Sequence, residues 1–133
     1  MEMPNVICMV SNHEYMALEC LEFLMKEITD MSIEELDEKM LDNLVTWQYN
    51  GSKSTINEFR QLDSETRREV IDFIKDFLIY EEIVVNGKNY LWVHAGLGNY
   101  LPDKDIEDYS IHELMWTGAA YDVQFFNDTY VVT

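Results

Sequence analysis

Three side chains in this sequence could hold a metal ion or move a proton, and each follows a short apolar run. Asn12 and His13 come after residues 6–10, and His94 comes after residues 90–93. A carboxamide oxygen and an imidazole nitrogen are both acceptable ligands for a borderline divalent metal. A histidine outside the metal's coordination, with a pKa of about 6.5, can give a proton to a departing alkoxide near neutral pH. Together these residue types would suit metal-assisted hydrolysis of a phosphoester.

Each candidate also has a purely structural interpretation. Ser11 and Asn12 are typical residues for capping the helix that should follow them. His94 has the alternative interpretation of a hydrogen-bonded core histidine at a strand end, because a short motif is only a hypothesis until its structural context is known. The methionines between residues 16 and 40 recur at helical spacing, which favours core packing over a copper site.

Strands should position these side chains. Residues 6–10 form a short apolar run between polar turn residues, which predicts a buried strand. Residues 83–85 and 90–93 are rich in strand-forming types, and the Asn86-Gly87 pair between them is a strong hairpin signal. Residues 130–133 also predict a strand. Because loops at the carboxyl ends of strands converge on one crevice in α/β sheets, we expect the candidate ligands to meet there.

Residues 14–78 are predicted to form one long helical insertion between these strands. Apolar residues recur at three- and four-residue steps from position 18 onward, which predicts a first amphipathic helix. A second helix should begin at the capping-box spacing of residues 32–35. A third should cover residues 55–62, and a fourth should follow Asp63-Ser64, with a buried face extending to position 78.

A short helix is predicted for residues 111–115, after the acidic loop of residues 102–108. Ser110 and Glu113 have the spacing of a capping box, which marks the helix start. His112 lies in the first turn, where a solvated histidine is the simpler expectation than a third metal ligand.

Composition restricts the class of protein and its partners. The chain has 133 residues, of which 47% are hydrophobic, enough for one domain with a single core. Nine basic and 26 acidic residues give a formal charge of −17, so neither nucleic acid nor a membrane surface is expected as a partner. Cys8 and Cys20 lack C-x-x-C spacing and are predicted to be reduced core residues. No signal peptide and no run of ~18 apolar residues is present, so a cytoplasmic location is expected.

The segments Ser11-Asn12-His13-Glu14 and Val93-His94-Ala95-Gly96 resemble two of the five sequence blocks of the calcineurin-like metallophosphoesterases. These blocks are usually written G-N-H-E and V-H-A-G, and the likeness is closest to the bacterial and phage serine/threonine phosphatase branch. The stretch Trp47-x-x-Asn50-Gly51-x-x-x-Thr55 also resembles a loop found between the blocks in that branch. The resemblance implies an α/β sandwich, of which this chain would be the central part with residues 14–78 as a helical cap.

The resemblance also implies roles for individual residues. In that family the sandwich holds a dinuclear centre of manganese, iron or zinc. By position, Asn12 and His94 would be ligands of the second metal, and His13 would be the acid that protonates the leaving group. The implied substrate is a phosphoprotein or a small phosphoester.

The sequence departs from the family at both ends. The first two blocks, Asp-x-His and Gly-Asp-x-x-Asp-Arg-Gly, have no room in the eleven residues before Asn12, and the last block would follow Thr133. Ser11 and Ser52 stand where glycine is common, and Gly118 stands where this branch often has arginine. Catalytic zinc normally has at least three protein ligands, so we expect weak or absent metal binding and little or no activity from this truncated chain.

Two further functions stay open. The chain could be a catalytically inactive remnant that binds a partner or forms a homodimer through sheet edges left exposed. It could also be an acidic protein with several weak cation sites that do not depend on His94.

Overall fold

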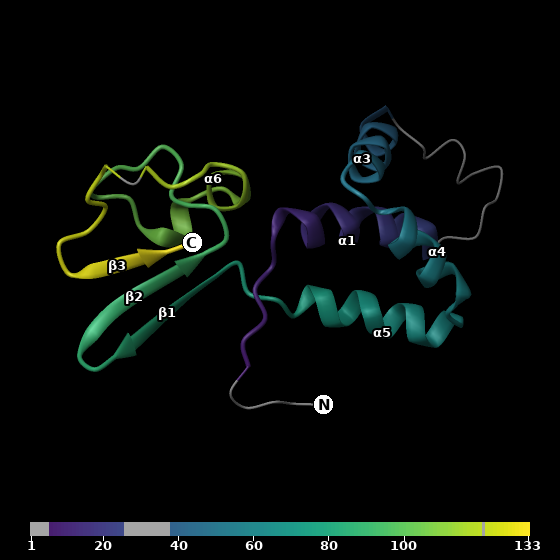
Figure 1. The fold of residues 1–133 in the computed structure, drawn as a ribbon, viewed down its shortest axis with the longest axis horizontal. Coiled ribbons are helices and arrows are strands. Elements are labelled where there is room, and N and C mark those ends of the chain that lie inside the picture. The colour runs from purple at the N-terminus through teal and green to yellow at the C-terminus, as the bar shows by residue number, and fades with distance from the viewer. Residues whose placement is uncertain (1–5, 26–37, 121) are drawn as a thin grey trace. The chain divides into compact units, whose positions relative to one another are not determined.

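The computed structural model describes residues 6–25, 38–120 and 122–133. It contains two compact units, a sheet unit of residues up to Asn12 with Phe77–Thr133, and a helical unit of His13–Asp76 (Figure 1). The capping box predicted at residues 32–35 lies outside the described residues. Within the described ranges, no helix is long and apolar enough to cross a membrane.

The helical unit is built from four described helices. They are α1 (Asn12–Met25), α3 (Glu38–Tyr49), α4 (Lys53–Gln61) and α5 (Ser64–Lys75). Each contributes to one core, whose buried members are Ala17, Cys20, Leu21, Trp47, Phe59 and Ile71. The buried face predicted for the fourth helix extended past the end of the observed helix. α5 ends at Lys75, and Leu78 lies beyond it with 40% of its surface exposed.

The start of α5 follows the predicted capping pattern. The Asp63 carboxylate accepts hydrogen bonds from the Thr66 backbone N–H at 2.9 Å and from its hydroxyl at 3.0 Å. These bonds favour the charged carboxylate and lower the pKa of Asp63. One turn later, Arg67 donates to the carbonyl oxygens of Phe59 and Arg60, at 3.0 Å and 2.6 Å. Those carbonyls lie in the last turn of α4, where helix carbonyls lack intrahelical partners, so Arg67 connects the two helices.

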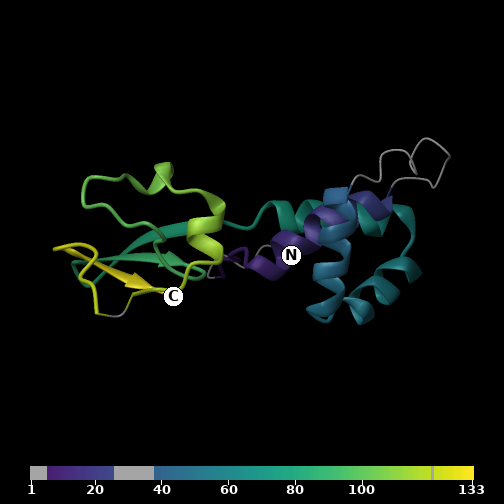
Figure 2. The same cartoon turned by 90° about the horizontal axis from the view of Figure 1, so that it is seen from above.

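The sheet unit holds a small mixed sheet. β1 (Tyr80–Val85) pairs antiparallel with β2 (Lys88–Val93), and β3 (Thr129–Val132) pairs parallel with β2, in the order β1-β2-β3 (Figures 1 and 2). Asn86 and Gly87 both have positive φ angles, 52° and 75°, so the predicted hairpin is confirmed. Helices together with this sheet confirm the α/β class at its general level.

The two faces of the sheet differ. Leu91 and Val93 of β2 are buried, and they pack with Leu97, Tyr109 and Leu114. The alternate residues of β2 face the other way, where Tyr90 stacks on Tyr130 of β3 with ring centroids 5.3 Å apart. Trp92 on the same face is 43% exposed.

Residues 6–10 do not form the predicted buried strand. They make one isolated parallel bridge, Met9 with Leu78, in which Val10 N–H donates to the Leu78 carbonyl and Leu78 N–H donates to the Cys8 carbonyl, both at 2.9 Å. Ile7 is 55% exposed. The pairing stays short because α1 begins at Asn12, soon after Met9, and α5 ends at Lys75, shortly before Leu78.

Replacing Gly87 with alanine should lower the free energy of unfolding by about 1–2 kcal/mol, because an L side chain is disfavoured at positive φ. A Cβ at this position meets no atom within 4 Å, so the cost would come from φ alone. Gly118→Ala is the control, since its Cβ also meets nothing within 4 Å and its φ is not positive. Urea unfolding of both variants measures the difference, and equal stability would contradict the proposed turn geometry.

Candidate metal and proton-transfer site

The two predicted metal ligands lie side by side in the sheet unit. Asn12 is the first residue of α1, and His94 follows the last residue of β2. The Asn12 Oδ1 atom and the His94 Nε2 atom are 3.1 Å apart, although 82 positions separate the residues in the sequence. His94 is exposed and Asn12 is half-buried. When the imidazole carries its proton on Nε2, this contact is a hydrogen bond donated to the carboxamide oxygen.

The same separation suits two neighbouring ligands of one metal ion. The Asn12 carboxamide oxygen and the His94 imidazole nitrogen would be the atoms that hold such an ion, and both are acceptable ligands for a borderline divalent metal. Binding would require the tautomer with the proton on Nδ1, so the metal would replace the hydrogen bond. Both ligands are neutral, and the described residues contain no group of three or more His, Cys, Asp or Glu side chains that could hold a metal.

A short helix holds the loop that carries His94. In α6 (Ile111–Met115), the Leu114 carbonyl accepts a hydrogen bond from Ala95 N–H at 2.9 Å. The Glu113 carbonyl accepts one from Gly98 N–H at 3.0 Å. These bonds join the loop to the end of α6, so the position of the imidazole depends on where α6 lies.

Gly96 allows this loop to pass close to the backbone of Thr117 and Ala119. A Cβ at Gly96 would lie 2.6 Å from Ala119 N and 2.8 Å from Thr117 O, both backbone atoms that cannot move aside cheaply. A glycine is therefore required after His94-Ala95 for steric reasons, independent of any catalytic role.

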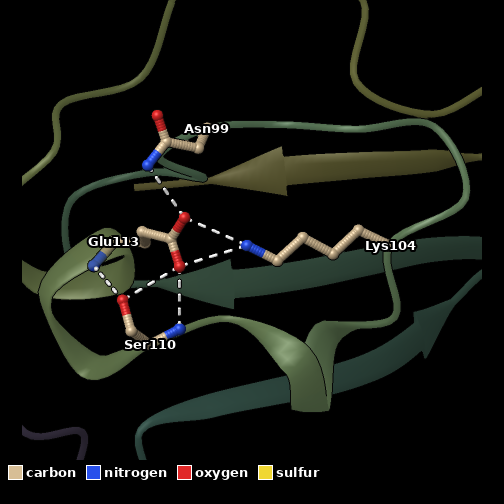
Figure 3. Close-up of polar contacts among 4 residues, drawn as sticks. All are labelled: Asn99, Lys104, Ser110 and Glu113. Carbon is tan, nitrogen blue, oxygen red and sulfur yellow. Dashed lines mark hydrogen bonds and ion pairs between the residues drawn. The ribbon is translucent and has the colours of Figure 1, made fainter.

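The Glu113 carboxylate connects α6 to the loop before it (Figure 3). It accepts hydrogen bonds from Ser110 N–H and Ser110 Oγ, both at 2.9 Å, and from Asn99 Nδ2 at 3.0 Å. The Lys104 ammonium lies 3.0 Å and 3.1 Å from its two oxygens. These contacts lower the pKa of Glu113 to about 2. The hydrogen bond from the Ser110 backbone N–H has the largest effect, followed by the contacts with Lys104 and Asn99. The predicted capping box is confirmed.

Sequence reasoning missed Asn99 and Lys104 as parts of this arrangement. Asn99 has a φ of 51°, a conformation that asparagine tolerates better than most residues. The Lys104 ammonium also lies 3.9 Å from the centre of the Tyr109 ring. The capping box was visible from its spacing of three, but no local pattern links positions 99 and 104 to position 113. His112 is exposed and stacks on Trp116, with ring centroids 5.7 Å apart.

His13 belongs to the helical unit and lines a cavity of about 500 Å³ within that unit. Trp47, Asn50 and Thr55 line the same cavity. The structure thus brings His13 together with the stretch from Trp47 to Thr55, two segments singled out separately in the sequence.

The burial of Cys20 in the same unit raises the pKa of its thiol to about 11, so it stays protonated near neutral pH.

Comparison with known proteins adds no relative: no protein-family model, no curated protein and no solved structure matches this chain. The metallophosphoesterase resemblance rests on the sequence segments themselves, and the roles of Asn12, His13 and His94 stay predictions.

Acid should weaken the sheet unit through Glu113. Because the folded state lowers the pKa of Glu113 from about 4.5 to about 2, its contribution to stability is complete above pH 4.5 and is lost as the pH falls toward 2. Glu113→Gln should therefore unfold more easily at neutral pH and lose less stability between pH 4.5 and pH 2 than the unchanged chain. Urea unfolding across this range measures both effects. Glu107→Gln, at an exposed position of the preceding turn, is the control, and matching pH profiles for the two variants would contradict this account.

Proposed function

We propose that this chain is the central part of a calcineurin-like metallophosphoesterase, close to the serine/threonine phosphatase branch. The reaction is hydrolysis of a phosphoester, either in a phosphoprotein or in a small molecule. One observation carries the proposal: the Asn12 carboxamide and the His94 imidazole, each from a family-like segment, approach to 3.1 Å across 82 positions of sequence. The exposure of His94 also argues against the interpretation as a core histidine.

Each of the three residues has a defined part in this chemistry. Asn12 and His94 would hold the metal, which when bound lowers the pKa of a coordinated water and neutralises charge at phosphorus. In hydrolysis, the P–O bond to the leaving group breaks as the oxygen of water bonds to phosphorus. Protonated His13 gives its proton to the leaving oxygen and recovers one from water. The expected activity is low, because two neutral ligands leave most of the metal's coordination to solvent.

Metal binding tests the site directly. Titration with Mn²⁺ should broaden the NMR signals of residues around Asn12 and His94 before other signals. The change His94→Ala should weaken this binding at least about tenfold, since mutating even a residue that only supports a metal ligand lowers metal affinity by that much. His112→Ala, at an exposed histidine of the same unit, is the matched control. Broadening spread over the acidic surface and unchanged in His94→Ala would instead indicate an acidic protein with several weak cation sites.

Activity tests the role of His13. Hydrolysis of p-nitrophenyl phosphate with Mn²⁺ should be slight or undetectable in this chain. Any hydrolysis that is observed should disappear in His13→Ala and persist in His112→Ala. Robust turnover would overturn the expectation of low activity, and turnover unaffected by His13→Ala would overturn the assignment of the acid.

The exposed surface of the sheet supports a second candidate function, a binding module without catalysis. Val85, Trp92 and Tyr130 are 46%, 43% and 54% exposed, and the register of the strands places all three on the face of the sheet away from Leu91. β1 and β3 are the outer strands, so each has backbone groups available on its far edge. An exposed apolar face next to open strand edges is typical of a surface that binds another chain.

Self-association is the measurable consequence of that alternative. Light scattering should show the mass rising from monomer toward dimer with concentration. Added salt should strengthen the dimer, because salt screens the repulsion between two copies that each carry a formal charge of −17. Trp92→Lys should restore the monomer, whereas Leu101→Lys, at a 61% exposed position outside the strands, should not. A monomer at all concentrations and salt levels would exclude the homodimer.

A further inference from the structure

The turn between α3 and α4 fixes the backbone of Ser52 next to Trp47. The Gly51 N–H donates to the Gln48 carbonyl at 3.2 Å. The Ser52 N–H donates to the Trp47 carbonyl at 3.3 Å, and these two bonds together form a Schellman motif at the end of α3. Gly51 has a φ of 94°, the left-handed conformation that this motif requires. The position of Ser52 is therefore set by the end of α3.

Ser52 occupies the N-cap position of α4 but does not cap the helix. A capping serine normally has an extended backbone, as Ser110 has with φ −68° and ψ 153°, whereas Ser52 has the helical values −66° and −8°. Its side chain makes no capping hydrogen bond. Ser52 is 3% exposed, and among the described residues its Oγ atom has no hydrogen-bond partner. Because an unpaired buried hydroxyl costs free energy, a partner supplied from outside the chain would stabilise the protein.

Ser52 lines the cavity of the helical unit together with side chains of the core. Leu21, Trp47 and Phe59 are buried core residues, and all three line this cavity. Its volume of about 500 Å³ is within the usual range of sites for small ligands, which combine apolar and aromatic walls with a few orienting polar groups. A serine side chain can turn its oxygen between three staggered rotamers, so Ser52 can supply such a group to the cavity.

We propose that this cavity binds a small neutral phenol, an aromatic ring that carries a hydroxyl group. The ring would pack against Trp47 and Phe59, since aromatic rings attract one another in edge-to-face and offset arrangements. The ligand hydroxyl would pair with the Ser52 hydroxyl, and either group can be the donor. A neutral ligand is favoured because a charged one would lose its hydration against the apolar wall. The site needs neither Asn12 nor His94, so it goes beyond the proposed phosphoester chemistry.

Binding can be measured with the full chain and without metal. The probe is p-cresol, whose hydroxyl is uncharged near neutral pH. The comparison is p-xylene, in which a methyl group replaces that hydroxyl. In two-dimensional NMR, both ligands should cause saturable shifts at the Trp47 indole N–H and at the backbone N–H groups of Ser52 and Thr55, because these residues line the cavity.

Variants assign the binding to the cavity and to the hydroxyl. Ser52→Ala should weaken p-cresol at least about threefold and leave p-xylene unchanged, because only p-cresol loses a hydrogen bond. The same change should raise the urea midpoint of the free chain, because it removes an unpaired buried hydroxyl. Ser54→Ala, at an exposed position of α4 outside the lining, is the matched control and should alter neither affinity. Val70→Phe should weaken both ligands, because the larger side chain would fill part of the cavity.

Four outcomes would overturn the proposal. The first is the absence of saturable shifts up to the solubility limits of the ligands, and the second is shifts that lie outside the lining or survive Val70→Phe. The third is an equal effect of Ser52→Ala on the two ligands. The fourth is a lower urea midpoint in Ser52→Ala, which would mean that the hydroxyl already has a partner within the chain. Because no metal is present, these outcomes are independent of whether Asn12 and His94 bind one.

Discussion

The carboxylate of Glu113 is the interaction on which the sheet unit most depends. α6 has only five residues, too few for a helix to be stable in isolation. The Glu113 side chain compensates by accepting hydrogen bonds from Ser110 at the helix start and from Asn99 and Lys104 in the preceding loop. Its backbone carbonyl then accepts from Gly98, and the loop after β2 is held in place. One charged group therefore stabilises both the helix and the loop.

The positions of the candidate ligands, Asn12 and His94, depend on short elements of this kind. His94 precedes the loop that α6 holds, and Asn12 follows an extended segment attached to the sheet unit through the single bridge between Met9 and Leu78. A functional constellation is only as exact as the elements that support it. The distance between the two side chains therefore depends on the bridge at Met9 on one side and on the bonds from Ala95 and Gly98 to α6 on the other.

The helical unit contributes a different kind of site. Its helices leave a cavity of about 500 Å³ whose lining includes the core residues Leu21 and Phe59 and the polar residues Ser52 and Glu58. His13 lies on the same lining, one residue along the chain from Asn12.

The sequence determined the features that depend on neighbouring residues. Asn86-Gly87 specified the hairpin because its φ angles are local, and Ser110 specified a helix start through a spacing of three. It also identified Asn12 and His94 through the types of residue that follow apolar runs. Only the tertiary structure decided that these two atoms lie 3.1 Å apart, and that residues 6–10 form a single bridge in place of a strand. Both outcomes depend on which distant segment supplies the hydrogen-bonding partner, and no local pattern encodes that choice.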